Sequence, residues 1–204
     1  MDGTVVVGLV VAAIAWGLLF ALGRDHFWPR AAAAGAVIGA YGLVAQRAEL
    51  GRLFAFEPVD VLIGVVSAAV LWAVFWIGDR VVTRLLPSLG AEVDDLYAVR
   101  GETTAARMPF VLAAVGPAEE IFWRGLVQHR VGIVIALVGY ALVHLWERKP
   151  ILLVAALVGG AFWGGLFAVT GSLVAPIVSH LLWDLAIIVW FPTRRSAPIG
   201  GAPS

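Results

Sequence analysis

Three short groups of ionisable or polar residues lie within apolar stretches in the second half of the chain. In order, they are Glu119 and Glu120 with Arg124, Tyr140 with His144, and His180 with Asp184. A charged side chain near the centre of a bilayer costs a few kcal/mol or more, so it usually faces a protein interior or a wet cavity. Carboxylates and imidazoles are also common general bases. The pattern therefore predicts a functional site inside a membrane domain.

Helical spacing predicts different roles for the two adjacent carboxylates. Residues four apart share a helix face, whereas adjacent residues diverge by about 100°. Glu120 can therefore reach Arg124, which leaves Glu119 free to act as a general base. Pro117, with Gly116 beside it, removes a backbone hydrogen bond and is expected to bend this helix next to the site.

The two histidines have predicted partners on their own helices. His180 and Asp184 are four residues apart, and so are Tyr140 and His144. A carboxylate that accepts from one imidazole nitrogen fixes the tautomer and leaves the other nitrogen free to face a cavity. We expect Asp184 to hold His180 in this way.

The composition indicates which elements must position these residues. Of the 204 residues, 61% are hydrophobic and 14% are charged, far from the balance of a soluble domain. Apolar stretches of about 17 to 25 residues can cross a ~30 Å hydrocarbon layer as helices. The sequence predicts an all-α, polytopic membrane helical bundle of about seven transmembrane helices: residues 4–22, 31–46, 59–77, 107–128, 131–146, 151–170 and 173–191.

The remaining segments have patterns of their own. The first apolar stretch has no basic segment before it and exceeds the usual length of a signal-peptide core, so we expect it to be a retained span. Residues 78–106 mix charged and apolar side chains, which predicts an interfacial amphipathic helix. The tail from Pro192 to Ser204 is rich in Pro, Gly and Ser and is expected to be disordered.

The distribution of Lys and Arg predicts an orientation. With an external amino terminus, most basic residues lie on the inner side, so the positive-inside rule favours an external amino terminus and a cytoplasmic tail. On straight helices, Glu119 lies ~12 Å and His144 ~20 Å from the outer face. For both to reach one site, the helix over 131–146 must tilt, begin later or end within the membrane.

Several other features limit the possible functions. The 14 basic and 14 acidic residues balance, so there is no electrostatic basis for a nucleic-acid partner. The sequence has no cysteine, which excludes disulfides, thiolate metal sites and cysteine nucleophiles. His26 and His129 lie at predicted helix ends and are expected to be solvated. Close helix packing accounts for four glycines: Gly159, Gly160, Gly164 and Gly165.

The three groups resemble, in order, the motifs of the CPBP family of CAAX-processing and bacteriocin-processing intramembrane proteases. The resemblance lies in Glu-Glu-x-x-x-Arg at 119–124, aromatic-x-x-x-His at 140–144 and His-x-x-x-Asp at 180–184. It covers roughly residues 105–192. The second motif usually has Phe where this chain has Tyr140, and the last position is often Asn where it has Asp184.

The resemblance, together with the composition of the remaining segments, divides the chain into three expected parts. They are variable N-terminal helices with the interfacial segment (1–104), a catalytic four-helix half (105–192) and a disordered tail (193–204). It also implies an endopeptidase in which Glu119 activates water and the histidines orient the water or polarise the carbonyl. The implied catalytic residues are Glu119, His144, His180 and Asp184, with structural support from Glu120, Arg124 and Tyr140.

The resemblance also implies the molecules with which this chain interacts. We expect a membrane-anchored or lipidated protein or peptide as substrate, the lipid bilayer as surroundings, and no nucleic acid. The expected location is a bacterial or archaeal cell membrane. No cofactor is expected to be required, although Glu119, His144 and His180 also form a known type of zinc ligand set.

Two other classes of function use similar residues. A non-catalytic immunity or scaffold protein of the same fold would keep the buried polar groups and bind a peptide or partner helix. A small proton-coupled transporter also uses buried carboxylates and histidines. The two halves of this chain show no inverted repeat, which argues against the transporter.

Overall fold

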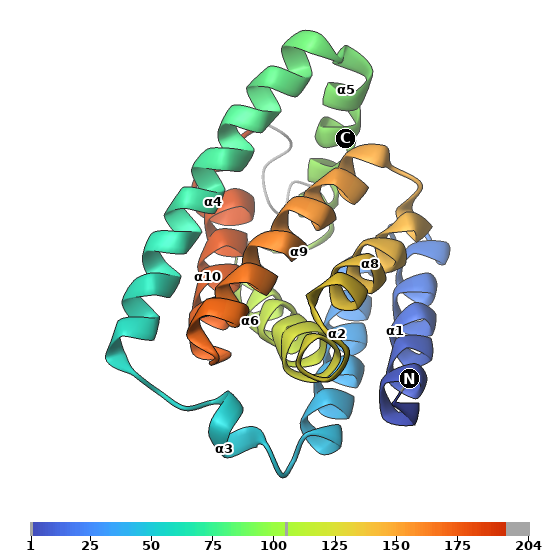
Figure 1. Cartoon of the computed structure of the whole chain (residues 1–204). Coiled ribbons are helices and arrows are strands. Elements are labelled where there is room, and N and C mark those ends of the chain that lie inside the picture. Colours follow the sequence, from blue (N-terminus) through green and yellow to red (C-terminus); the bar gives the residue numbers. More distant parts are fainter. Residues whose placement is uncertain (1, 105, 195–204) are drawn as a thin grey trace.

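The computed structural model describes residues 2–104 and 106–194, and the regular structure there is all helical (Figure 1). Three helices are long and apolar enough to cross a membrane: α1 (Gly3–Ala21), α4 (Pro58–Leu85) and α9 (Pro150–Thr170). Two shorter apolar segments, Ile133–Glu147 and Val174–Trp190, pack against them. The all-α membrane class is confirmed, whereas seven crossings stay a prediction.

Each of the seven predicted stretches coincides with helical structure. Four of them form single helices: α1, α2 (Phe27–Ala45), α4 and α9. The other three change helical type along their length: α6 (Met108–Glu120) continues into η2 (Ile121–Gln128) and α7 (His129–Val131), α8 (Ile133–Val143) into η3 (His144–Glu147), and α10 (Val174–Asp184) into η4 (Leu185–Trp190). These changes fall at or next to candidate site residues.

The helix α4 is longer than the predicted stretch 59–77. The predicted end reflected the charged residues that follow, but the helix continues to Leu85. The Arg80 guanidinium lies 3.4 Å from the centre of the Trp76 ring on the same helix, which gives this charge a favourable contact. The helix ends just before Pro87, where a proline disfavours helical backbone in the preceding residue.

The segment predicted as an interfacial amphipathic helix forms two shorter pieces. The helix α5 (Pro87–Tyr97) folds back along α4 and makes the upper hairpin in Figure 1, and the 3₁₀ turn η1 (Ala98–Glu102) follows it. Asp95 of α5 forms an ion pair with Arg24 at 2.7 Å and another with Lys149. These pairs tie the hairpin to the loop after α1 and to the start of α9.

The last described residues contact this hairpin. Arg194 Nε donates to Asp79 at 3.0 Å, and the hydroxyls of Thr193 and Tyr97 lie 3.2 Å apart. These two residues belong to the segment that was predicted to be a disordered tail. The rest of that predicted tail, residues 195–204, lies outside the described residues.

Small residues place α6 in the middle of the bundle. A Cβ on Gly39 of α2 would lie 2.9 Å from Cβ of Ala118, so only glycine allows α2 to approach α6 so closely. A Cβ on Gly64 of α4 would lie 2.7 Å from Val178 of α10. Since Ala118 precedes Glu119, the first contact fixes the helix directly beside the candidate site.

Candidate active site

The four candidate catalytic residues line one cavity of about 290 Å³. Glu119 comes from α6, His144 from η3, and His180 and Asp184 from α10. The rest of the wall is mostly apolar and aromatic and includes side chains from the amino-terminal helices, namely Trp16, Phe20, Phe27, Trp28 and Ala31. The structure therefore brings together side chains that lie up to 65 positions apart in the sequence, from Glu119 to Asp184.

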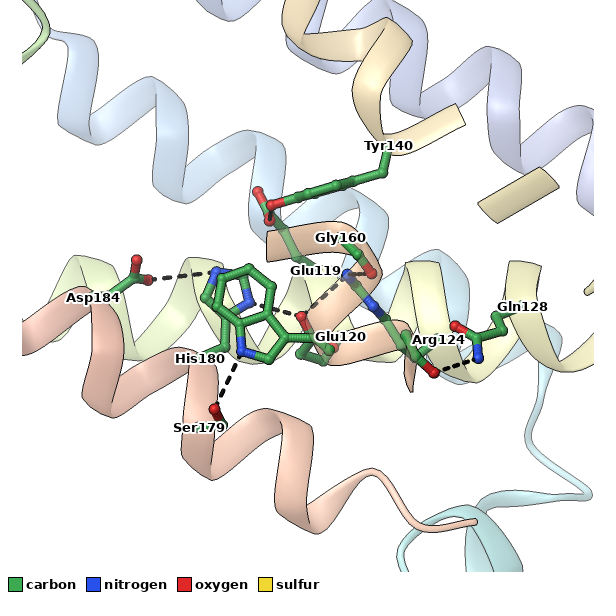
Figure 2. Close-up of polar contacts among 11 residues, drawn as sticks. Glu119, Glu120, Arg124, Gln128, Tyr140, Gly160, Ser179, His180 and Asp184 are labelled. Atoms are coloured by element: carbon green, nitrogen blue, oxygen red, sulfur yellow. Dashed lines mark hydrogen bonds and ion pairs between the residues drawn. The ribbon is translucent and has the colours of Figure 1, made fainter. Parts of the chain in front are cut away.

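Glu120 is completely buried, at 0% exposed, and connects two helices (Figure 2). Arg124 Nη1 donates to Glu120 Oε1 at 3.1 Å, as its spacing predicts. His180 Nδ1 donates to the same oxygen at 2.7 Å. This second bond joins α6 to α10, so spacing within one helix could not predict it.

The hydrogen bond predicted between Asp184 and His180 is not formed. Asp184 Oδ2 lies 3.9 Å from His180 Nε2, beyond hydrogen-bond range. The carboxylate of Glu120 accepts from the other ring nitrogen and therefore keeps a proton on Nδ1. Trp163 of α9 stacks on the imidazole, with 3.6 Å between ring centres and 16° between planes. His180 is thus held by Glu120 and Trp163.

Glu119 differs from its neighbour in having no ion pair with an Arg or Lys of the described residues. It is 6% exposed and lines the cavity. The Tyr140 hydroxyl donates to Glu119 Oε2 at 2.9 Å. The carboxylate that was predicted to be free of Arg124 is therefore the one that faces the cavity.

His144 has one ring nitrogen occupied. Its Nδ1 donates to the backbone carbonyl of Tyr140 at 2.7 Å, which leaves Nε2 as an acceptor in the neutral ring. The helix α8 begins at Ile133, two residues after the predicted start, and becomes a 3₁₀ turn at His144. The later start shortens the distance from the helix start to His144 by about 3 Å, and the depth of His144 in the membrane stays a prediction.

Widened helical turns follow the two carboxylates directly. The segment η2 starts at Ile121 and has π-helical geometry, which is rare and often occurs at functional sites. Pro117 lies four residues earlier and cannot donate a backbone hydrogen bond. These wide turns lie on the C-terminal side of Pro117, whereas the missing hydrogen bond lies on its N-terminal side. The bend expected at Pro117 stays a prediction.

Two glycines have a larger role than the packing assigned to them from sequence. The Gly160 carbonyl accepts from Arg124 at 3.1 Å, and the Gly164 carbonyl accepts from Gln128 at 2.8 Å. A Cβ on Gly160 would lie 3.0 Å from the Tyr140 ring. The sequence carries a signal for these two bonds, because the donors Arg124 and Gln128 are four residues apart and so are the acceptors Gly160 and Gly164.

The other two histidines do not line the cavity. His26 and His129 are both exposed, and His129 Nε2 lies 2.7 Å from Arg52 Nη2.

The described residues contain no group of three His, Asp or Glu side chains placed to hold a metal ion. In the zinc set considered from sequence, Nδ1 of each histidine already donates to a protein oxygen. Glu119 accepts from Tyr140. Metal-bound histidines usually make such a bond from Nδ1 and ligate through Nε2, so these bonds do not argue against that ligand set. That no cofactor is required stays a prediction, and the mechanism below uses protein side chains alone.

A match to known proteins covers the segment that carries all these motifs. Residues 101–186 match the family described as type II CAAX prenyl endopeptidase, Rce1-like. Comparison with curated proteins and with solved structures gives no match. The family match agrees with the resemblance of the three motifs. Residues 101–186 of this chain therefore form an Rce1-like type II CAAX prenyl endopeptidase domain of the CPBP family.

Proposed function

We propose that this chain is an intramembrane endopeptidase in which Glu119 activates a water molecule. The bond cleaved lies near the C-terminus or the membrane anchor of a membrane-anchored or lipidated protein or peptide. The main support is that Glu119, His144 and His180 line one cavity, in which Glu119 has no cationic partner among the described residues. The family domain supports the reaction class.

The free atoms of these side chains suggest how the reaction proceeds. Glu119 takes a proton from water while the water oxygen attacks the peptide carbonyl carbon. Neutral His144 accepts from the same water through Nε2, because Nδ1 is held by the Tyr140 carbonyl. Protonated His180 donates from Nε2 to the carbonyl oxygen as it gains charge. Glu119 then gives its proton to the leaving amine as the C–N bond breaks.

The remaining site residues position these groups. Glu120 and Arg124 form a buried pair that holds His180, and Tyr140 holds Glu119 through its hydroxyl. An ionised Asp184 cannot donate to an oxyanion. Asp184 Oδ2 lies 3.9 Å from His180 Nε2, so we assign Asp184 to stabilising the protonated imidazole by its charge, without a hydrogen bond.

Replacing Glu119 tests the proposal directly. The full chain in proteoliposomes is given an internally quenched peptide with a prenylated cysteine near its C-terminus, and cleavage is followed by fluorescence. Loss of a general base lowers rates by roughly 10²- to 10⁴-fold, so Glu119→Gln should be nearly inactive. Glu57→Gln is the matched control, since Glu57 is exposed and precedes α4. Unchanged cleavage by Glu119→Gln would contradict the mechanism.

The proposal includes an external amino terminus and a cytoplasmic tail. Because the sequence has no cysteine, single cysteines introduced for labelling give an unambiguous signal. A cysteine at Glu49 should react with an impermeant maleimide in intact cells. A cysteine at Arg84 should react only after permeabilisation. The reverse pattern would invert the proposed orientation.

A further inference from the structure

A second cavity, of about 330 Å³, lies between α4, α5, α9 and η4. We call it the α4–α9 cavity. Its wall is mainly aliphatic and includes Val74 of α4 and Val154 and Val158 of α9. These three side chains are also exposed on the outer surface of helices long enough to span a membrane. The cavity therefore borders the surface that faces lipid.

One cationic side chain in this wall has no anionic partner among the described residues. Arg100 is 7% exposed, and its buried Nε makes no hydrogen bond within the described residues. The other charged residue of the wall, Asp79, is paired with Arg194. The guanidinium carbon lies 5.8 Å from the centre of the Tyr97 ring, a contact that supplies no negative charge. A buried guanidinium without an anion is costly, because it loses hydration. The site has the charge and the shape for an apolar ligand with an anionic end.

We propose that the α4–α9 cavity binds a membrane amphiphile, whose single apolar chain fills the cavity and whose terminal carboxylate or phosphate pairs with Arg100. The cavity volume lies within the range of small-molecule sites, which is about 300 to 1,000 Å³. Arg forms strong, often bidentate bonds with both anions. A membrane supplies such molecules at the open side of the cavity.

The polar groups of the wall favour an acyl chain over a peptide. Every peptide residue brings a backbone carbonyl, and all but proline bring an N–H, and these groups need partners when buried. The Tyr97 hydroxyl already donates to the Ile187 carbonyl, and the Trp28 indole donates to Val99. Among the described wall residues, the buried side-chain donors without a partner are Arg100 Nε and the Trp183 indole N–H. An acyl chain requires no such partners.

The proposed lipid would lie directly behind the catalytic cavity. The two cavities share a wall, which includes Trp28, Leu96, Val99, Leu152 and Trp183. The lipid site does not depend on hydrolysis, so it is tested by binding and not by activity. Failure of one proposal therefore leaves the other open to its own test.

Native mass spectrometry of the purified full chain, released from detergent, measures the binding. The probes are oleate, lysophosphatidylglycerol and oleyl alcohol, which has the oleyl chain without the charge. We expect one bound oleate or lysophosphatidylglycerol, and about tenfold weaker binding of the alcohol, because a charged bond is lost. The two anionic probes distinguish a carboxylate from a phosphate source. Equal binding of oleate and oleyl alcohol would overturn the proposal.

Two variants locate the site. Arg100→Gln should weaken oleate binding about tenfold, whereas Arg100→Lys keeps the charge and should retain most of it. Gly78→Leu should block binding, because Gly78 lines the cavity and a Cβ there meets no atom within 4 Å. The exposed Arg84 provides the control Arg84→Gln.

The outcomes can be separated even if one variant is unstable. If Arg100→Gln does not fold, Gly78→Leu decides, since a leucine suits a helix better than glycine does. Wild-type binding by Gly78→Leu would place the lipid elsewhere and overturn the proposal. A free-carboxylate apolar hexapeptide that binds more tightly than both anionic lipids would also overturn it, in favour of a peptide site.

Discussion

The two parts of the chain use polar residues in different ways. In residues 101–186, buried polar side chains bond to one another across helices, as Glu120 does with His180 and Tyr140 with Glu119. The described ion pairs whose two members both precede residue 101 lie near helix ends and are partly exposed, as between Glu49 and Arg52. The family domain therefore holds the candidate chemistry.

The amino-terminal helices contribute shape instead. Trp16 and Phe20 of α1 and Trp28 of α2 close one side of the cavity that the candidate catalytic residues line. The Trp16 ring centre lies 6.5 Å from that of His144. This contrast predicts that substitutions in the buried network affect stability and activity, whereas matched substitutions in the amino-terminal part have little effect.

The largest expected effect on stability follows from replacing Arg124 with Met. The change removes the arginine partner of the fully buried Glu120, and removing one partner of a buried pair costs about 3–5 kcal/mol. Thermal unfolding in detergent measures the loss. Arg84→Met, at an exposed arginine of α4, should change stability by less than about 0.5 kcal/mol. If Arg124→Met and Arg84→Met lowered the stability equally, the contrast between the family domain and the amino-terminal helices would be wrong.

A second pair of variants compares two glycines of α9. A Cβ on Gly160 would lie 2.8 Å from Leu137 and 3.0 Å from Tyr140, so Gly160→Ala should cost about 1–3 kcal/mol through overpacking. Displacement of Tyr140 should also slow cleavage. Gly165→Ala meets no atom within 4 Å and should be neutral or stabilising. Unfolding and cleavage assays on both variants test whether sensitivity follows the network.

A third comparison removes one hydroxyl from each part of the chain. Tyr140→Phe deletes the bond to Glu119, and a bond to a charged group is worth about 1.5–3 kcal/mol, so cleavage should fall by roughly tenfold or more. Tyr41→Phe deletes a bond to the Thr4 carbonyl and should leave the rate unchanged. A full rate for Tyr140→Phe would show that packing alone positions Glu119.

The smallest expected effect lies at the surface of the hairpin. Hydrogen bonds from Arg24 and Lys149 hold the pKa of Asp95 below its usual 3.8. Stabilisation by the ionised group is therefore present above that value and is lost as the pH falls through the lowered pKa. Asp95→Asn should reduce stability at pH 7 by less than about 1 kcal/mol, because the pair is partly exposed. Unfolding measured across pH should show this difference vanish in acid.

The sequence predicted the helices well where apolar length alone decides them. The predicted stretch 151–170 differs by one residue from α9. The sequence placed the end of α4 too early. The contact of Arg80 with the Trp76 ring accommodates the charge, and composition does not reveal such a contact. The spacing of four residues correctly predicted the bond between Arg124 and Glu120. The same spacing predicted a bond between His180 and Asp184, which is not formed.

Sequence alone determined that this chain is an all-α membrane protein, because apolar length and intramembrane charge are properties of short segments. It also marked Glu119 as the carboxylate free of Arg124, since one helix sets both positions. Only the tertiary structure decided that Glu120 holds His180, that the Gly160 carbonyl accepts from Arg124, and that Arg100 lines an apolar cavity. These contacts join separate helices, and the spacing of residues within one helix carries no information about them.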